Sequence, residues 1–182
     1  MNANANTDTI EQPTNSLLNI QTLMTFIELD EFDYSSEFYK IFIISNKLEL
    51  TRLSKSVKQD DPSCGVILSN KHNIYTLCLK NTENNDNISF VNFKLFDDAT
   101  DTTNITNTTN HYIYINYTFT YITHRQNGFN KMLRLLVERI AKHFIKSNPK
   151  IISVPLPGAN SCIVLDKLNY NNNNGVYCKI LD

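Results

Sequence analysis

The chain has 182 residues, with 17 basic and 18 acidic side chains and a formal net charge of −1. Hydrophobic residues make up 41% of it and charged residues 19%, which indicates one globular domain with its own core. The near-zero charge gives no general case for binding to nucleic acid or to an anionic membrane, so an anion site would have to be local. No apolar run approaches the length of a membrane span, and we expect none.

Asparagine and isoleucine are heavily used, and residues 171–174 are all asparagine. This bias is typical of an AT-rich coding genome, such as that of an amoeba or of a large virus of amoebae. The four cysteines show no C-x-x-C spacing, so we expect no metal site. Residues 1–15 lack the regions of a signal peptide. We therefore expect a polar, disordered tail before a single domain over 16–182, reduced thiols, and an intracellular location, in the host cytoplasm if the protein is viral.

The first part of the domain carries a mixed pattern. Apolar residues from Leu17 to Ile27 fit a helix face, or a strand followed by a helix. We expect a helix from Glu37, capped by Ser35 or Ser36, although the run 41–44 favours a strand.

A β region follows. We expect a hairpin of strands 65–69 and 74–79 around an asparagine-bounded turn, and then a third β segment over 88–96. Residues 97–110 are polar and of low complexity, which predicts an exposed loop.

The strongest strand signal runs from Tyr112 to Tyr121. Its odd-numbered positions from Ile113 onward are apolar or aromatic, and we expect them on one face of a sheet. After a short loop, an apolar stripe from Met132 to Phe144 predicts a helix packed on that sheet. Most charged residues of this helix, Arg134 among them, are expected outside the stripe.

Three further elements follow the long helix. Residues 151–156 suit a buried strand parallel to the central one, because strand–helix–strand of this length is a crossover unit. A short helix is expected over 162–168, then a turn at 171–174 and a closing strand over 175–181.

The loop between the central strand and the long helix reads Arg125-Gln126-Asn127-Gly128-Phe129-Asn130. A glycine-bearing turn that leads directly into a helix is a potential phosphate site, because the first N–H groups of a helix have no partner within it. The alternative is a plain strand–turn–helix in which Gly128 is structural.

Two markers resemble the GNAT (GCN5-related) N-acetyltransferase family, over roughly residues 64–182. The loop matches R/Q-x-x-G-x-G/A as Arg125-x-x-Gly128-x-Asn130. Residues 161–170 resemble the S-x-x-V-L-x-K-L-G-F ending of the branch that acetylates ribosomal proteins. The resemblance implies an α+β, three-layer fold with a mixed, mostly antiparallel sheet and flanking helices. In it, a central parallel strand pair splays around the cofactor, acetyl-CoA. An amine is the implied acceptor, and the oligomeric state, monomer or homodimer, stays open.

The resemblance also implies a set of cofactor-binding residues. Backbone N–H groups of residues 126–131 would hold the pyrophosphate, with added charge from Arg125 or Lys131. A backbone N–H near Tyr121 or Ile122 would polarise the thioester carbonyl. The candidates are Tyr121, Ile122, Arg125, Gln126, Asn127, Gly128, Phe129, Asn130, Lys131 and Asn160.

The candidate catalytic residues are His124, as a base, and Tyr170 or Tyr177, as an acid. Among the departures from the family pattern, two concern catalysis: Leu165 stands where many members have the tyrosine that acts as general acid, and the central strand has no carboxylate. Cys162 has no histidine or acidic partner at a recognisable spacing.

Three functions stay open at this point. The first is an acetyl-CoA-dependent N-acetyltransferase acting on a protein N-terminus, a lysine, a polyamine or an amino sugar. The second is a GNAT-like binding or structural module that has lost catalysis. The third is an unrelated α+β interaction domain.

Overall fold

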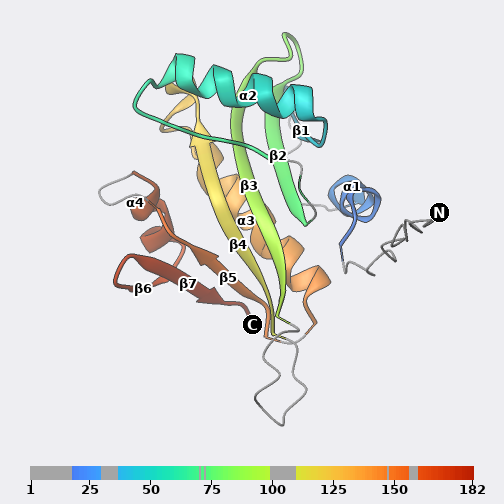
Figure 1. The fold of residues 1–182 in the computed structure, drawn as a ribbon, viewed down its shortest axis with the longest axis vertical. Helices are drawn as coiled ribbons and strands as arrows, with labels where there is room; N and C mark the ends of the chain where they lie inside the picture. The colour runs from blue at the N-terminus through green and yellow to red at the C-terminus, as the bar shows by residue number, and fades with distance from the viewer. Residues whose placement is uncertain are drawn as a thin grey trace, which may run out of the picture.

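The structure is a computed structural model that describes residues 18–29, 37–69, 71, 73–98, 110–146, 148–155 and 160–182 (Figure 1). The expected tail at 1–15 and the expected caps Ser35 and Ser36 lie outside these residues, as does most of the expected loop at 97–110. The elements are α1 (Ile20–Leu29), β1 (Tyr39–Ile43), α2 (Lys47–Asp60), β2 (Ile74–Asn81), β3 (Asn87–Asp98), β4 (Asn110–Thr120), the 3-10 turn η1 (Ile122–His124), α3 (Phe129–Phe144), β5 (Lys150–Ser153), α4 (Asn160–Lys167), β6 (Asn171–Asn173) and β7 (Val176–Ile180).

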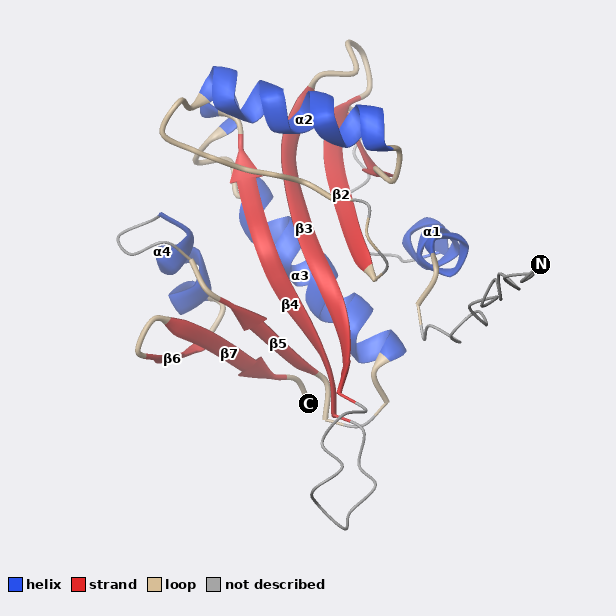
Figure 2. Cartoon of the chain, in the orientation of Figure 1, coloured by secondary structure: helices blue, strands red, loops and turns tan. Residues whose placement is uncertain are grey.

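The strands form one mixed sheet in the order β1-β2-β3-β4-β5-β7-β6. All neighbours are antiparallel except β4 and β5, which run parallel as predicted. Their pairing extends only from Tyr112 and Lys150 to Ile115 and Ser153, while β4 continues to Thr120. The two strands therefore part beyond Ile115, and Figure 2 shows them diverging.

Helices cover both faces of the sheet (Figure 1). The larger core lies on the α3 side, where α3 contributes Leu133, Leu136, Val137 and Ile140. A smaller core lies on the α2 side, where Leu50, Leu53 and Val57 pack on the sheet. Apolar burial on each face stabilises the sheet between the two helix layers.

A bulge in β4 divides its side chains between these two cores. Asn92 pairs with Tyr117, whereas Phe93 pairs with Ile115, so Asn116 is the extra residue. An extra residue reverses the alternation beyond it. Ile115 accordingly lies in the core beside α3, whereas Phe119 lies in the core under α2. The prediction that all odd positions share one face is therefore wrong beyond the bulge.

The expected helix from Glu37 is also wrong. The β-favouring run forms β1, which pairs with β2 on the sheet edge. The helix begins at Lys47, where the side chain of Asn46 accepts the Leu48 N–H at 2.8 Å. The earlier apolar pattern, which could have been a helix or a strand and a helix, forms α1.

The expected hairpin of strands 65–69 and 74–79 does not form. Residues 64–69 have no regular structure, and β2 pairs with β1 and β3 instead. The expected turn at 171–174 begins with a short strand, β6, which pairs with β7. The left-handed residues Asn174 and Gly175 make the turn itself. The other predicted strands and helices, β3, β4, α3, β5, α4 and β7, are confirmed to within a few residues.

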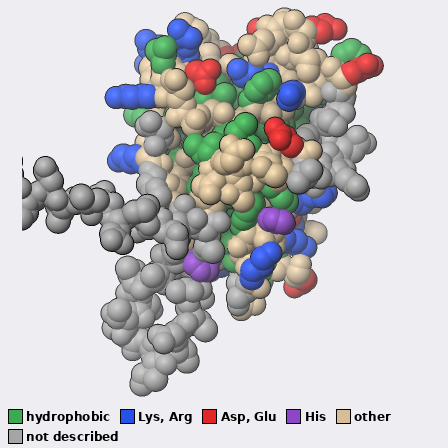
Figure 3. Space-filling view, turned by 90° about the vertical axis from the view of Figure 1, so that its right-hand side faces the viewer, with side chains coloured by type: hydrophobic (Ala, Val, Ile, Leu, Met, Phe, Trp, Pro, Cys, Tyr) green, Lys and Arg blue, Asp and Glu red, His purple; other side chains and the backbone are tan. Residues whose placement is uncertain are grey.

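The edge of the sheet at β1 exposes apolar side chains, and Figure 3 shows hydrophobic side chains running down this face of the molecule. Phe38 and Phe42 are among the exposed hydrophobic residues. The ammonium groups of Lys40 and Lys80 lie 5.9 and 5.2 Å from the centre of the Phe42 ring. Lysines along an edge strand oppose pairing with another chain. None of the described helices combines the length and the apolarity that a membrane crossing requires.

Candidate functional site

The loop after η1 contains two left-handed residues. Gln126 has a φ of 71° and Gly128 a φ of 81°. Glycine adopts this conformation freely, whereas a residue with a side chain does so at a steric cost. Gly128 is the N-cap of α3, and its carbonyl accepts the Met132 N–H at 3.0 Å. Because Gly128 has no side chain with which to cap the helix, the first N–H groups of α3 are left for another acceptor.

A cavity of about 700 Å³ borders this loop. Its walls come from the part of β4 that has no β5 partner, the loop, the start of α3, the segment after α2, and α4. The lining residues are Asp61, Ser63, Cys64, Thr118, Phe119, Thr120, His124, Arg125, Gln126, Gly128, Phe129, Asn130, Lys131, Asn160, Ser161, Ile163, Val164 and Lys167. The cavity therefore lies where the parallel strands separate and α3 begins.

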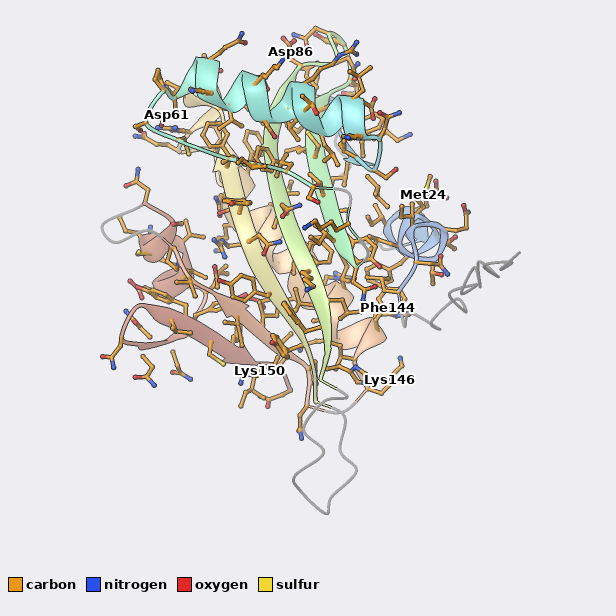
Figure 4. All side chains as sticks on the ribbon, in the orientation of Figure 1. Met24, Asp61, Asp86, Phe144, Lys146 and Lys150 are labelled. Carbon is orange, nitrogen blue, oxygen red and sulfur yellow. The ribbon has the colours of Figure 1, made fainter. Side chains whose placement is uncertain are left out.

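The charge of this cavity differs from that of the whole chain. Three basic side chains border it, those of Arg125, Lys131 and Lys167, against the single carboxylate of Asp61. Asp61 is the C-cap of α2 and lies at the end of that helix nearest β4 (Figure 4). Hydrogen bonds from Ser63 and from Arg125, the latter at 2.9 Å, hold the pKa of Asp61 below its usual value. The balance favours an anionic ligand.

The structure brings together most of the predicted cofactor-binding residues. Those that line the cavity are Arg125, Gln126, Gly128, Phe129, Asn130, Lys131 and Asn160. Asn127 does not line it, and its side-chain amide donates to the His124 carbonyl at 3.3 Å.

The structure does not leave Tyr121 and Ile122 free for the role that the resemblance implies. The Tyr121 N–H donates to the Ile88 carbonyl at 3.1 Å, and the Ile122 N–H donates to a carboxylate oxygen of Asp60 at 2.9 Å. The Tyr121 hydroxyl shares a hydrogen bond with Ser56 at 2.6 Å. Neither residue lines the cavity. A hydrogen-bond donor for a carbonyl bound in the cavity would therefore have to come from one of the residues that line it.

Of the predicted catalytic residues, His124 borders the cavity and the two tyrosines do not. Tyr170 and Tyr177 are each 5% exposed. Burial raises the pKa of Tyr170, and the negative charge of Glu138 raises it further. Burial, followed by a hydrogen bond with the Cys162 thiol, raises the pKa of Tyr177. Leu165 is fully buried in the larger core.

The sequence matches no protein-family model and no curated protein. Solved structures, by contrast, resemble it in fold. NAA60 of Arabidopsis thaliana in complex with acetyl-CoA is 12% identical, with a TM-score of 0.59 over 78% of this chain and 100% of that chain. A ribosomal-protein-alanine N-acetyltransferase from Brucella melitensis biovar Abortus 2308 is also 12% identical, with a TM-score of 0.53 over 74% and 93% of the two chains. The aminoglycoside N-acetyltransferase AAC(6')-Iy in complex with CoA is 16% identical, with a TM-score of 0.53 over 75% and 90%.

The chain has the GNAT fold. The predicted fold class is thereby confirmed, including the parallel pair β4–β5. At sequence identities of 12% to 16%, the similarity to these solved structures concerns the backbone fold alone.

Within this GNAT fold, the sequence analysis missed a buried side chain that contacts two residues of the cavity wall. Arg134 was expected outside the apolar stripe of α3, yet it is only 1% exposed. Its guanidinium donates to Asn130 at 2.9 Å and to the Thr118 hydroxyl at 2.9 Å, and lies 3.5 Å from the Ser153 hydroxyl. The spacing of four between Asn130 and Arg134 is a weak signal for such a contact, since residues four apart on a helix are neighbours.

Proposed function

We propose that this protein is an acetyl-CoA-dependent N-acetyltransferase that moves an acetyl group to a primary amine. The observation that carries the proposal is the cavity at the uncapped start of α3. The basic side chains of Arg125, Lys131 and Lys167 border the same cavity. Uncapped N–H groups at a helix start, together with cations, bind phosphate oxygens. The GNAT fold and the acetyl-CoA and CoA complexes among the similar structures support the same ligand.

In the proposed reaction, the loop and the start of α3 hold the phosphates while the acyl end lies between the separated strands β4 and β5. The acceptor amine must be uncharged to attack the acyl carbon, and His124 borders the cavity. Imidazole is the side chain that most readily exchanges a proton near neutral pH, which fits the role of base. The candidate acceptors are a protein N-terminus, a lysine, a polyamine and an amino sugar.

Calorimetry with acetyl-CoA tests this proposal. We expect the wild type to bind and Gly128→Glu to lose binding, because a carboxylate at the N-cap of α3 would repel the phosphates. Gly175→Glu is a matched control: the two glycines have φ values of 81° and 85°, and in both places an added Cβ meets no atom within 4 Å. It carries the same strain outside the cavity and should bind normally. A wild type that does not bind acetyl-CoA would refute the proposal.

A second candidate function is a GNAT-fold binding module without catalysis. It is favoured by the position of the two tyrosines, which are buried and do not border the cavity, and by the ion pair that engages Asp61. Release of CoA from acetyl-CoA across a panel of N-terminal peptides, lysine peptides, polyamines and aminoglycosides separates the two. Binding without release on any of these amines supports the module.

A further inference from the structure

The acyl carbonyl of a thioester bound in this cavity needs a hydrogen-bond donor that the expected N–H groups do not supply. Those of Tyr121 and Ile122 are engaged with Ile88 and Asp60. Thr118 lies on β4 beyond the last β4–β5 pair, and it lines the cavity. Its hydroxyl is therefore placed in the gap between the two strands, where the acyl end is proposed to lie.

The hydrogen bond from Arg134 determines the direction in which the Thr118 hydroxyl can donate its proton. The guanidinium nitrogen donates to the Thr118 oxygen at 2.9 Å. The hydroxyl proton then has to point away from Arg134, and among the described residues no acceptor takes it. Donation from a cation into the oxygen strengthens the hydroxyl as a donor in its turn.

Among the residues that the structure describes, no carboxylate forms an ion pair with Arg134. Its contacts are the neutral side chains of Asn130, Thr118 and Ser153. Glu138, one turn along α3, forms its ion pair with Lys179 at 2.7 Å. Burial lowers the pKa of Arg134 to about 10, which leaves the group protonated at neutral pH. A buried cation without a paired anion favours negative charge that develops close by.

We propose that Thr118 is a catalytic residue whose hydroxyl donates a hydrogen bond to the acyl carbonyl oxygen, and that Arg134 is the positioning residue that orients it. This inference rests on the proposed acetyl transfer. The amine nitrogen bonds to the acyl carbon and the carbonyl electron pair moves to the oxygen, where Thr118 stabilises it. The C=O bond then re-forms, the C–S bond breaks, and the proton lost by the amine ends on the thiol of CoA.

Infrared difference spectroscopy tests the contact without an acceptor amine. The probe is acetyl-CoA labelled with carbon-13 at the carbonyl and bound to the protein. A hydrogen bond lowers the C=O stretching frequency, so we expect Thr118→Val to raise it and Thr118→Ser, which keeps the hydroxyl, to restore it. Thr51→Val is the control, because Thr51 lies on α2 outside the cavity wall and its hydroxyl donates to the Lys47 carbonyl at 2.8 Å. A frequency that Thr118→Val leaves unchanged would overturn the proposal.

Turnover separates catalysis from binding. With an amine that the wild type acetylates, we expect Thr118→Val to lower kcat about 100-fold, as loss of one oxyanion donor does, while the Kd of CoA stays unchanged. CoA lacks the acyl carbonyl, so it does not sense this contact. A parallel loss of CoA affinity would make Thr118 a binding residue and contradict the proposal.

A double-mutant cycle tests whether Arg134 acts through Thr118. Methionine fills a similar volume, and a buried charge is often replaced by an apolar residue without loss of the fold. We expect Arg134→Met to shift the carbonyl band towards that of Thr118→Val, and the double variant to match Thr118→Val alone. Additive effects, or a lower Tm with no shift of the band, would show that Arg134 is only structural. Failure of the wild type to bind acetyl-CoA refutes the proposed function itself, whereas binding with an unmoved band refutes only this inference.

Discussion

The cysteines provide a residue-level test of the cavity. All four cysteines are among the described residues and none forms a disulfide, and burial raises the pKa of Cys78 to about 12. The pKa of Cys64, which lines the cavity, is raised by burial and by the charge of Asp61. Because the thiolate is the reactive form, we expect iodoacetamide at about pH 8 to leave Cys78 unlabelled in the native protein. Mass spectrometry after proteolysis measures labelling at each site.

The same labelling experiment, repeated with acetyl-CoA, tests where the ligand binds. We expect acetyl-CoA to slow labelling of Cys64 and to leave Cys178 unaffected, because Cys178 lies on β7 and not in the cavity wall. Labelling in urea, where all four thiols react, provides the reference. Equal protection of Cys64 and Cys178 would contradict the placement of the ligand.

Thr118, in the cavity wall, and Arg134, which contacts it, show why residue-level prediction had limits. The loop residues around Gly128 were predicted, because glycine before an amphipathic helix has a local physical meaning. The role proposed for Thr118 rests on the divergence of two strands that meet only in the folded sheet. Arg134 was assigned to the surface because charged residues are rarely buried. Its burial depends on acceptors from β4 and the helix start, which no local pattern encodes.

At the level of elements, the bulge in β4 depends on a chain of amides across the sheet. Asn92 is 2% exposed; its amide donates to the Thr76 hydroxyl at 2.8 Å, and its carbonyl accepts from Asn116, the bulge residue, at 2.9 Å. Asn92→Ala would leave these partners unsatisfied, so we expect it to lower the free energy of unfolding by about 2 kcal/mol. Urea denaturation measures this. Asn171→Ala, at an exposed position of β6, is the control and should change it little. Equal effects of both variants would show that the amide chain does not support the bulge.

Long, regular elements were predictable and short, context-dependent ones were not. The apolar stripe of α3 and the alternation of β3 and β4 each extend over many residues, which separates a helical period from a strand period. β1 has only five residues, and its pairing with β2 decides its conformation. The bulge at Asn116 reversed the faces of β4 because one extra residue leaves no mark in an alternating pattern.

At the level of the whole molecule, a net charge of −1 coexists with a cavity bordered by three basic side chains and one acidic one. The sequence predicted that an anion site would be local. The side chains that surround this anion site were only partly predictable from the sequence. Arg125 and Lys131 belong to the loop and the start of α3, whereas Asp61 and Lys167 reach the cavity from distant elements. Their arrangement depends on the fold.

The two helix layers should differ in stability, and the cavity should couple them. The structure buries seven side chains of α3 but only three of α2, so we expect α2 amides to exchange hydrogen faster, through local opening. The C-terminal end of α2 is tied to the loop through Asp60 and Ile122 and through Asp61 and Arg125. A ligand that orders the loop should therefore slow exchange in α2, which exchange measured by mass spectrometry with and without acetyl-CoA would detect. The exposed edge strand β6 is the internal control and should not change. Equal slowing of α2 and β6, or slower exchange in α2 than in α3, would contradict this coupling.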